Sequence, residues 1–337
     1  METQPQLKQF SYELQPSNQI KKNINCQAIA INKQNKFVIV TSDSKILVIF
    51  FKNGQLKKLA TIIKHKKDVS TLNFFNYNSN FVSGSQSVII WPLSLISNQK
   101  YIQKISGHAK MIQCLALHPS EFLIVSGSSD ATIQFWFNYE QQLNNQKITD
   151  HKDSVFGLAI NKEGNRIVSC GKDKLILIIE KSNSHHPFWQ VRQTITSNEF
   201  GYRICFINDN AIAFQPISYY KGYNNGTDHL HIYTPDEDQI YTKSKEIMVA
   251  GGGQICHYYF PSIYNSNKEI LLVKNGYMVS LLRINDQFKG KNQYIFFNCL
   301  KFYKGLIIGT LSEDGEYFIT WDAKSKEIQI RKYQETE

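Results

Sequence analysis

The chain has 337 residues, of which 42% are hydrophobic and 13% aromatic, so it is long and apolar enough to bury a large core. This composition excludes a disordered chain, and the longest apolar run, residues 46–51, is far shorter than the ~18 residues of a membrane-spanning helix. The formal net charge of +10 favours acidic partners or nucleic acid but does not bear on the fold.

The first residues, METQPQLKQF, lack the basic start and apolar centre of a secretory signal, so we expect a cytoplasmic or nuclear protein that is not secreted. Residues 1–8 are predicted to form a tail. In the following segment, QFSYEL, the residues Phe10, Tyr12 and Leu14 alternate with polar residues, which is typical of a strand. Six cysteines stand far apart without a CxxC pair, which predicts reduced core thiols and no metal or disulfide.

Residues 26–50, CQAIAINKQNKFVIVTSDSKILVIF, contain short apolar strand patterns divided by a turn, and they predict a first structural unit. Two later segments, GHAKMIQCLALHPSEFLIVSGSSDATIQFW and DHKDSVFGLAINKEGNRIVSCGKDKLILII, align at a spacing of 43 residues. The spacing pairs His108 with His151, Ser126 with Ser169 and Asp130 with Asp173. A third copy begins a further 43 residues upstream at His65 and keeps Ser83 but has no turn aspartate.

Repeats of ~40–45 residues with a Gly-His pair and a late tryptophan are typical of propeller blades. Gly107, His108, Ser126, Asp130 and Trp136 match the motif of the WD40-repeat (G-protein-β-like) family, so the central third of the chain resembles that family. The resemblance implies a hydrogen-bonded structural tetrad inside each complete blade. Its predicted members are His108, Ser126, Asp130 and Trp136 in one copy, and His151, Ser169 and Asp173 in the next.

The Trp-Asp pair that gives the family its name is eroded here. Phe137 follows Trp136, Pro92 follows Trp91, and Ile179 replaces the tryptophan of the next copy. The literal pair at 321–322 stands before the last strand of its unit and is not counted as the motif.

Past Ser197 the motif residues fade, but strand-and-turn patterns continue and give three more units, seven in all. Residues 217–228, ISYYKGYNNGTD, are predicted to be an insertion. We therefore predict an all-β fold, a seven-bladed WD40-type β-propeller in a single domain at residues 9–333, with a C-terminal tail at 334–337. The N-terminal strand is expected to close the ring beside residues 327–332, because an open ring would leave edge strands exposed.

A histidine, a serine and an aspartate also make up a hydrolytic triad, but repetition at the blade period favours a structural role. The segment GGGQ at residues 251–254 lacks the lysine and hydroxyl residue of a phosphate loop, and His229 and His231 have no partner ligands at zinc spacing. We therefore predict no enzyme activity, no catalytic residue, no metal and no cofactor.

The resemblance implies that the residues just after each blade histidine line the rim of the central opening, where partner proteins dock. These positions are Asn23, Lys67, Lys110, Asp153, Tyr202, Gly253 and Lys304. Three lysines and a tyrosine suit an acidic or phosphorylated segment. We therefore predict a non-catalytic protein-interaction scaffold that is a subunit of a larger complex, and the alternative is that these are ordinary solvated loop residues.

Two other functions stay open at this point. An RNA-binding or ribonucleoprotein-associated subunit would use the basic surface, although the basic residues are scattered and no stacking motif of the RNA modules is present. A cytosolic iron–sulfur assembly propeller has a similar length. A signalling G-protein β subunit is disfavoured, because the N-terminal segment is too short and polar for its long coiled-coil helix.

Overall fold

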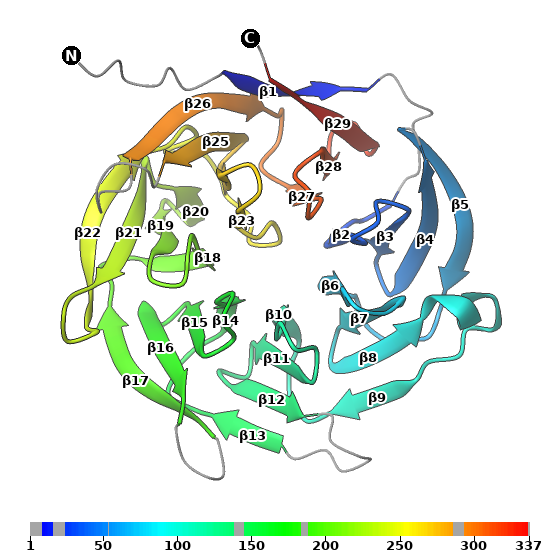
Figure 1. Cartoon of the computed structure of the whole chain (residues 1–337), viewed down its shortest axis with the longest axis horizontal. Helices are drawn as coiled ribbons and strands as arrows, with labels where there is room; N and C mark the ends of the chain where they lie inside the picture. The colour runs from blue at the N-terminus through cyan, green and yellow to red at the C-terminus, as the bar shows by residue number, and fades with distance from the viewer. Residues whose placement is uncertain are drawn as a thin grey trace.

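The computed structural model describes residues 9–15, 24–52, 54–137, 145–182, 188–285 and 293–335. These residues form seven antiparallel sheets arranged in a ring (Figure 1). We number the sheets 1 to 7 in chain order, beginning with the sheet of β2. Apart from strands and turns, the described residues form the 3₁₀-helix η1 (Leu93–Asn98), which follows β8 in sheet 2.

The first four sheets each run from an inner to an outer strand in chain order. Sheet 1 contains β2 (Ile29–Ile31), β3 (Phe37–Ser42), β4 (Lys45–Lys52) and β5 (Gln55–Ile62), and sheet 2 contains β6 (Thr71–Phe74), β7 (Asn80–Gly84), β8 (Ser87–Pro92) and β9 (Gln103–Ser106). Sheet 3 contains β10 (Ile112–Leu117), β11 (Leu123–Ser128), β12 (Ile133–Phe137) and β13 (Asn145–Ile148), and sheet 4 contains β14 (Val155–Ile160), β15 (Arg166–Gly171), β16 (Leu175–Lys181) and β17 (Trp189–Thr196).

The last three sheets follow the same order with two modifications, an added strand in sheet 5 and a borrowed strand in sheet 7. Sheet 5 contains β18 (Phe200–Phe206), β19 (Ile212–Tyr220), β20 (Tyr223–Gly226), β21 (His229–Pro235) and β22 (Tyr241–Met248), and sheet 6 contains β23 (Ile263–Asn265), β24 (Ile270–Asn275), β25 (Met278–Asn285) and β26 (Gln293–Lys301). Sheet 7 contains β27 (Ile307–Leu311), β28 (Tyr317–Asp322), β29 (Ile328–Glu335) and β1 (Phe10–Leu14).

The middle strands of each sheet are covered on both faces by neighbouring sheets, so they appear in the sequence as continuous apolar runs rather than alternating patterns. All six residues of β24 are buried, for example, whereas the outer strand β17 alternates between buried or half-buried and exposed residues. The hydrophobic core lies between adjacent sheets. One cluster joins Phe135 of sheet 3 to Leu177 and Trp189 of sheet 4.

The strand nearest the N-terminus completes the last sheet. β1 pairs antiparallel with β29, with Phe10 opposite Glu335 and Leu14 opposite Arg331, so the first and last strands of the chain lie side by side in Figure 1. The pairing is therefore centred nearer the C-terminus than the predicted partner residues 327–332. β29 continues to Glu335, two residues beyond the predicted end of the domain, because these residues extend the ladder with β1.

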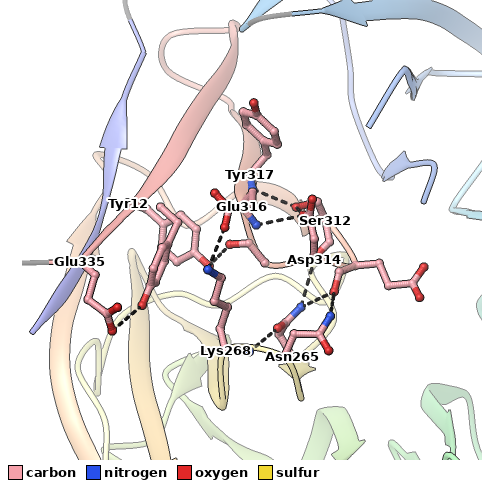
Figure 2. Close-up of polar contacts among 12 residues, drawn as sticks. Tyr12, Asn265, Lys268, Ser312, Asp314, Glu316, Tyr317 and Glu335 are labelled. Atoms are coloured by element: carbon pink, nitrogen blue, oxygen red, sulfur yellow. Dashed lines mark hydrogen bonds and ion pairs between the residues drawn. The ribbon is translucent and has the colours of Figure 1, made fainter. Parts of the chain in front are cut away.

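Figure 2 shows how side chains anchor this strand to the turn between β27 and β28. The buried phenol of Tyr12 donates a hydrogen bond to the carbonyl oxygen of Gly315 at 2.8 Å. Lys268 of sheet 6 forms an ion pair with Glu316 at 2.7 Å in the same turn. Contacts from the first strand, sheet 6 and sheet 7 thus meet at one turn.

Two further features of the sequence can now be located. The predicted insertion at 217–228 forms a hairpin of β19 and β20 that turns at Lys221 and Gly222, both of which have positive φ angles. Trp321 lies near the end of β28, the second strand of sheet 7, whereas Trp91 and Trp136 lie on the third strands of sheets 2 and 3. The literal Trp-Asp pair therefore lies outside the motif position, and Asp322 instead accepts hydrogen bonds from the backbone of the following turn.

Candidate functional site

The most regular polar site is a chain of hydrogen bonds inside sheet 3. Trp136 donates its indole N–H to Ser126 Oγ at 2.9 Å, and Ser126 Oγ lies 2.8 Å from His108 Nε2. His108 Nδ1 lies 3.0 Å from Asp130 Oδ2, and because a carboxylate only accepts, Nδ1 carries the proton and Ser126 donates to Nε2. A side chain at Gly107 would meet the Trp136 ring at 2.5 Å, which explains the glycine before the histidine.

Sheet 4 repeats this arrangement without the tryptophan. His151 Nε2 lies 2.9 Å from Ser169 Oγ, and His151 Nδ1 lies 2.9 Å from Asp173 Oδ2. Ile179, which is fully buried, takes the place of the tryptophan, so Ser169 Oγ receives no indole N–H. The structure therefore brings together all seven residues predicted for the tetrads.

Burial and hydrogen bonding fix the charges of the sheet 3 tetrad. Burial lowers the pKa of His108 despite its contact with Asp130, so the imidazole is neutral at pH 7. Burial alone would raise the pKa of Asp130, but hydrogen bonds from Thr132, the Ala109 N–H and His108 together lower it to about 2. Within the tetrad, a neutral histidine is therefore hydrogen-bonded to an ionised carboxylate.

Five of the seven rim positions predicted from the motif lie on one face of the ring. Because every sheet repeats the same antiparallel order, the connections from one outer strand to the next inner strand lie on a single face. We call it the histidine face, since these connections carry His65, His108 and His151. Five predicted positions are exposed in them, namely Lys67, Lys110, Asp153, Gly253 and Lys304. Asn23 lies outside the described residues.

Tyr202 differs from the other rim positions, because it is 4% exposed and belongs to the inner strand β18. The ladder to β19 skips Tyr202, and the same bulge occurs at Gln113 in β10 and Phe156 in β14. All three residues line a cavity of about 160 Å³ that is bounded by the inner strands. The bulges therefore direct one side chain from each of three successive sheets towards the axis of the ring.

Comparison with known proteins identifies the repeat. The family model described as WD domain, G-beta repeat matches residues 99–136 and 143–180. Each matched range runs from the outer strand of one sheet through three strands of the next, and together they contain both tetrads. The chain belongs to the WD40-repeat family.

Similarity to individual proteins covers only parts of this WD40 protein. Cilia- and flagella-associated protein 52 of Mus musculus is 26% identical over 158 residues, which are 46% of this chain and 25% of the relative. Pre-mRNA-processing factor 19 of Bos taurus is 30% identical over 78 residues, which are 23% of this chain and 15% of the relative. The chain thus matches a quarter or less of the length of these relatives.

A solved structure shows the same fold over nearly the whole chain. A chain in "Crystal Structure of Mitotic Checkpoint Complex" has a TM-score of 0.72, and the alignment covers 98% of this chain and 95% of that one at 15% sequence identity. At this identity the likeness concerns the fold alone.

Two other kinds of feature are absent from the described residues of the WD40 protein. The described residues contain no group of three or more His, Cys, Asp or Glu placed to hold a metal ion. Within the same part of the chain, no helix has the length and apolar character of a membrane span.

One buried cluster was not predicted from the sequence. Cys256 Sγ lies 3.4 Å from both Arg203 Nη1 and Lys274 Nζ, and the two basic side chains are 1% and 0% exposed. Burial alone would raise the pKa of the Cys256 thiol, but Lys274 and Arg203 lower it to about 7. The three residues come from β18, β24 and the connection between sheets 5 and 6, so no sequence motif joins them.

The buried histidines make stability depend on pH. Burial and the nearby Lys104 lower the pKa of His65 to about 4, and burial lowers that of His108, whereas an unfolded histidine titrates near ~6.5. As the pH falls below ~6.5 the unfolded chain takes up protons that the folded chain does not, so stability is lost. We expect the melting temperature to fall steadily between pH 7 and pH 4 in circular dichroism melts.

The variant His65→Gln is expected to flatten part of this dependence, because it removes a histidine whose pKa is lowered to about 4 in the folded protein. A melting temperature that stays constant or rises between pH 7 and pH 5 would contradict the assignment of neutral buried histidines.

Proposed function

We propose that this WD40 protein is a non-catalytic scaffold that docks partner proteins, or acidic peptides from them, on the rim of its histidine face. The observation that supports this proposal most directly is that Lys67, Lys110 and Lys304 are exposed on this face, each in a different connection between two sheets. Among the described residues none of these three ammonium groups has an ion-pair partner, so their charges are available to an acidic segment.

Neighbouring groups on the same face extend this surface. Tyr303, beside Lys304, is 76% exposed, and the ammonium of Lys324 lies 3.5 Å from the centre of its ring. Asp153 is the acidic exception on the rim and lies 3.8 Å from Lys172. Exposed tyrosine and lysine side chains next to one another offer both contact area and positive charge to a partner.

The tetrads support the non-catalytic part of the proposal. Ser126 and Ser169 are both 0% exposed, so their hydroxyl groups are closed to a substrate. Each hydroxyl already bonds the histidine that would have to activate it, and in sheet 3 it also accepts from the indole. We infer that these groups stabilise the sheets, as in other members of the family, and that binding is located on the rim.

The test is affinity purification from cytoplasmic and nuclear extracts of the source cells, the compartments in which we expect the protein, followed by mass spectrometry. In the double variant Lys67→Glu/Lys110→Glu we expect partner recovery to fall about tenfold or more, because an attractive charge becomes a repulsive one at two positions. The melting temperature should stay unchanged, since exposed substitutions alter stability by less than ~0.5 kcal/mol.

The matched control is Lys57→Glu/Arg192→Glu, which changes the net charge equally on exposed positions of the outer strands β5 and β17. This control should retain its partners. Recovery that persists in the rim variant would count against the rim. If both double variants instead lose RNA binding equally, and the affinity for RNA falls steeply with salt, the basic surface acts as a nucleic-acid-binding surface.

A further inference from the structure

Sheet 2 lacks the carboxylate that completes the polar site in sheets 3 and 4. In those sheets Asp130 and Asp173 each contact a histidine Nδ1 and also accept the backbone N–H that follows it, at 2.8 Å from Ala109 and 2.7 Å from Lys152. Ten residues separate Ser126 from Trp136, but only eight separate Ser83 from Trp91. The turn of sheet 2 is thus two residues shorter, and the aspartate is missing from it.

A hollow of about 130 Å³ lies at this position on the histidine face. It is lined by residues of the connection before β6, the short turn between β7 and β8, and β8 and β9, which are Lys64, His65, Lys66, Lys67, Ser85, Gln86, Ser87, Ile89 and Lys104. A cavity needs roughly 10–15 Å³ to hold one water, so the hollow has room for a hydrated anion of the size of phosphate.

His65 presents an unpaired donor to this hollow. The residue is 9% exposed, and its Nε2 lies 2.7 Å from Ser83 Oγ, which accepts the indole N–H of Trp91 at 2.8 Å. The Ser83 hydroxyl therefore donates to Nε2, because its other acceptor, the Ile89 carbonyl, is 3.5 Å away. That assignment leaves the proton on Nδ1, the atom that contacts a carboxylate in sheets 3 and 4, and no described residue accepts it.

The charges around the hollow have a single sign. Lys64, Lys66, Lys67 and Lys104 line it, and no carboxylate is among its described lining residues. None of these ammonium groups has an ion-pair partner within the described parts of the chain. The acid nearest in the sequence, Asp68, instead accepts a hydrogen bond from Gln27 at 3.3 Å.

We propose that this hollow binds the phosphoryl group of a phosphorylated partner segment, which occupies the place that the turn carboxylate holds in sheets 3 and 4. The proposal rests on the proposed function and specifies the partner's chemistry. A phosphoryl group fits better than a carboxylate, because it carries close to two negative charges and three acceptor oxygens. These match several lysines, the Nδ1–H of His65 and the backbone N–H of Lys66, for which the described part of the chain offers no acceptor.

The first test follows the His65 imidazole resonances by NMR while inorganic phosphate is added to the full chain at constant ionic strength. We expect saturable shifts in the wild type and an affinity about tenfold weaker in Lys104→Met, because the variant removes one of the positive charges that line the hollow. The control Lys57→Met removes an exposed lysine far from the hollow and should bind as the wild type does.

A turn graft provides the sharper variant. Replacing residues 85–87 by the five-residue turn of residues 128–132 restores the aspartate and fills the hollow from within. We expect this variant to melt at a higher temperature than the wild type and to give no phosphate-dependent shift of His65. Unchanged phosphate binding in the graft, or no shift in the wild type, would overturn the proposal.

The second test identifies the source of the phosphoryl group with a short acidic peptide that contains one phosphoserine. Fluorescence polarisation should show binding about tenfold or more tighter than for the unphosphorylated peptide, and this difference should be lost in Lys104→Met and in the graft. Free phosphate binding without a preference for the phosphopeptide, or equal binding of single-stranded RNA, would refute a phosphorylated partner segment. Because Lys67 and Lys110 are intact in these variants, a negative result leaves the rim test of the proposed function standing.

Discussion

The substitution Trp136→Ala is expected to lower the free energy of unfolding by about 3–5 kcal/mol. The indole is 3% exposed and packs in the core between sheets 2 and 3, so its removal leaves a large cavity there. It also removes the donor that binds Ser126 Oγ at 2.9 Å. Chemical denaturation monitored by circular dichroism measures the loss directly.

Three related variants separate packing from hydrogen bonding. Trp136→Phe keeps most of the ring and should cost only about 1–2 kcal/mol. Ser126→Ala removes the partner of both His108 Nε2 and the Trp136 indole N–H and should cost about 2–4 kcal/mol, whereas Ser169→Ala removes the partner of His151 Nε2 and should cost about 1–2 kcal/mol. Equal losses for the two serine variants would contradict a role for the indole in the hydrogen-bond chain.

Deleting residues 1–16 is expected to lower the melting temperature by about 10 °C or more. The deletion removes Phe10 and Tyr12, which are 4% and 3% exposed and pack with Phe260, Phe318 and Tyr333. Truncating a buried aromatic side chain to alanine costs ~3–5 kcal/mol, and the edge of β29 would also lose its hydrogen-bonding partner. A thermal melt of the shortened protein measures the effect.

Two controls test whether the strand itself causes this loss. Deleting only residues 1–8, the predicted tail, should leave the melting temperature unchanged. The single variant Tyr12→Phe keeps the ring but removes the hydrogen bond to Gly315, so it should cost about 1 kcal/mol. A protein without residues 1–16 that melts like the wild type would refute closure of the ring by β1.

The fold was predictable because its signals are local and repeated. The 43-residue spacing of His65, His108 and His151 and the apolar middle strands reflect the same unit, which must bury both faces against its neighbours. The strand content past Ser197 was also predictable, since strand patterns persist where motif residues do not. The exposure of Lys67 and Lys110 followed from their position two residues after His65 and His108.

Features that depend on register or on distant contacts were not predictable. Tyr202 was expected on the open rim, but a β-bulge turns it towards the axis, and a bulge has no simple sequence signature. The cluster of Arg203, Cys256 and Lys274 joins three distant segments. The hollow of sheet 2 arises from a two-residue difference in a turn, which acquires meaning only once the carboxylates of sheets 3 and 4 are located.

The central claim is that the histidine, serine and aspartate side chains of the tetrads stabilise sheets 3 and 4, whereas partner binding depends on the rim lysines. The most direct test measures partner recovery per folded molecule, below the melting temperature, for Ser126→Ala and for Lys67→Glu/Lys110→Glu. We predict that Ser126→Ala retains its partners although it melts earlier, and that the lysine variant loses them without a change in melting. The opposite pattern, in which Ser126→Ala melts normally but loses its partners, would contradict the account.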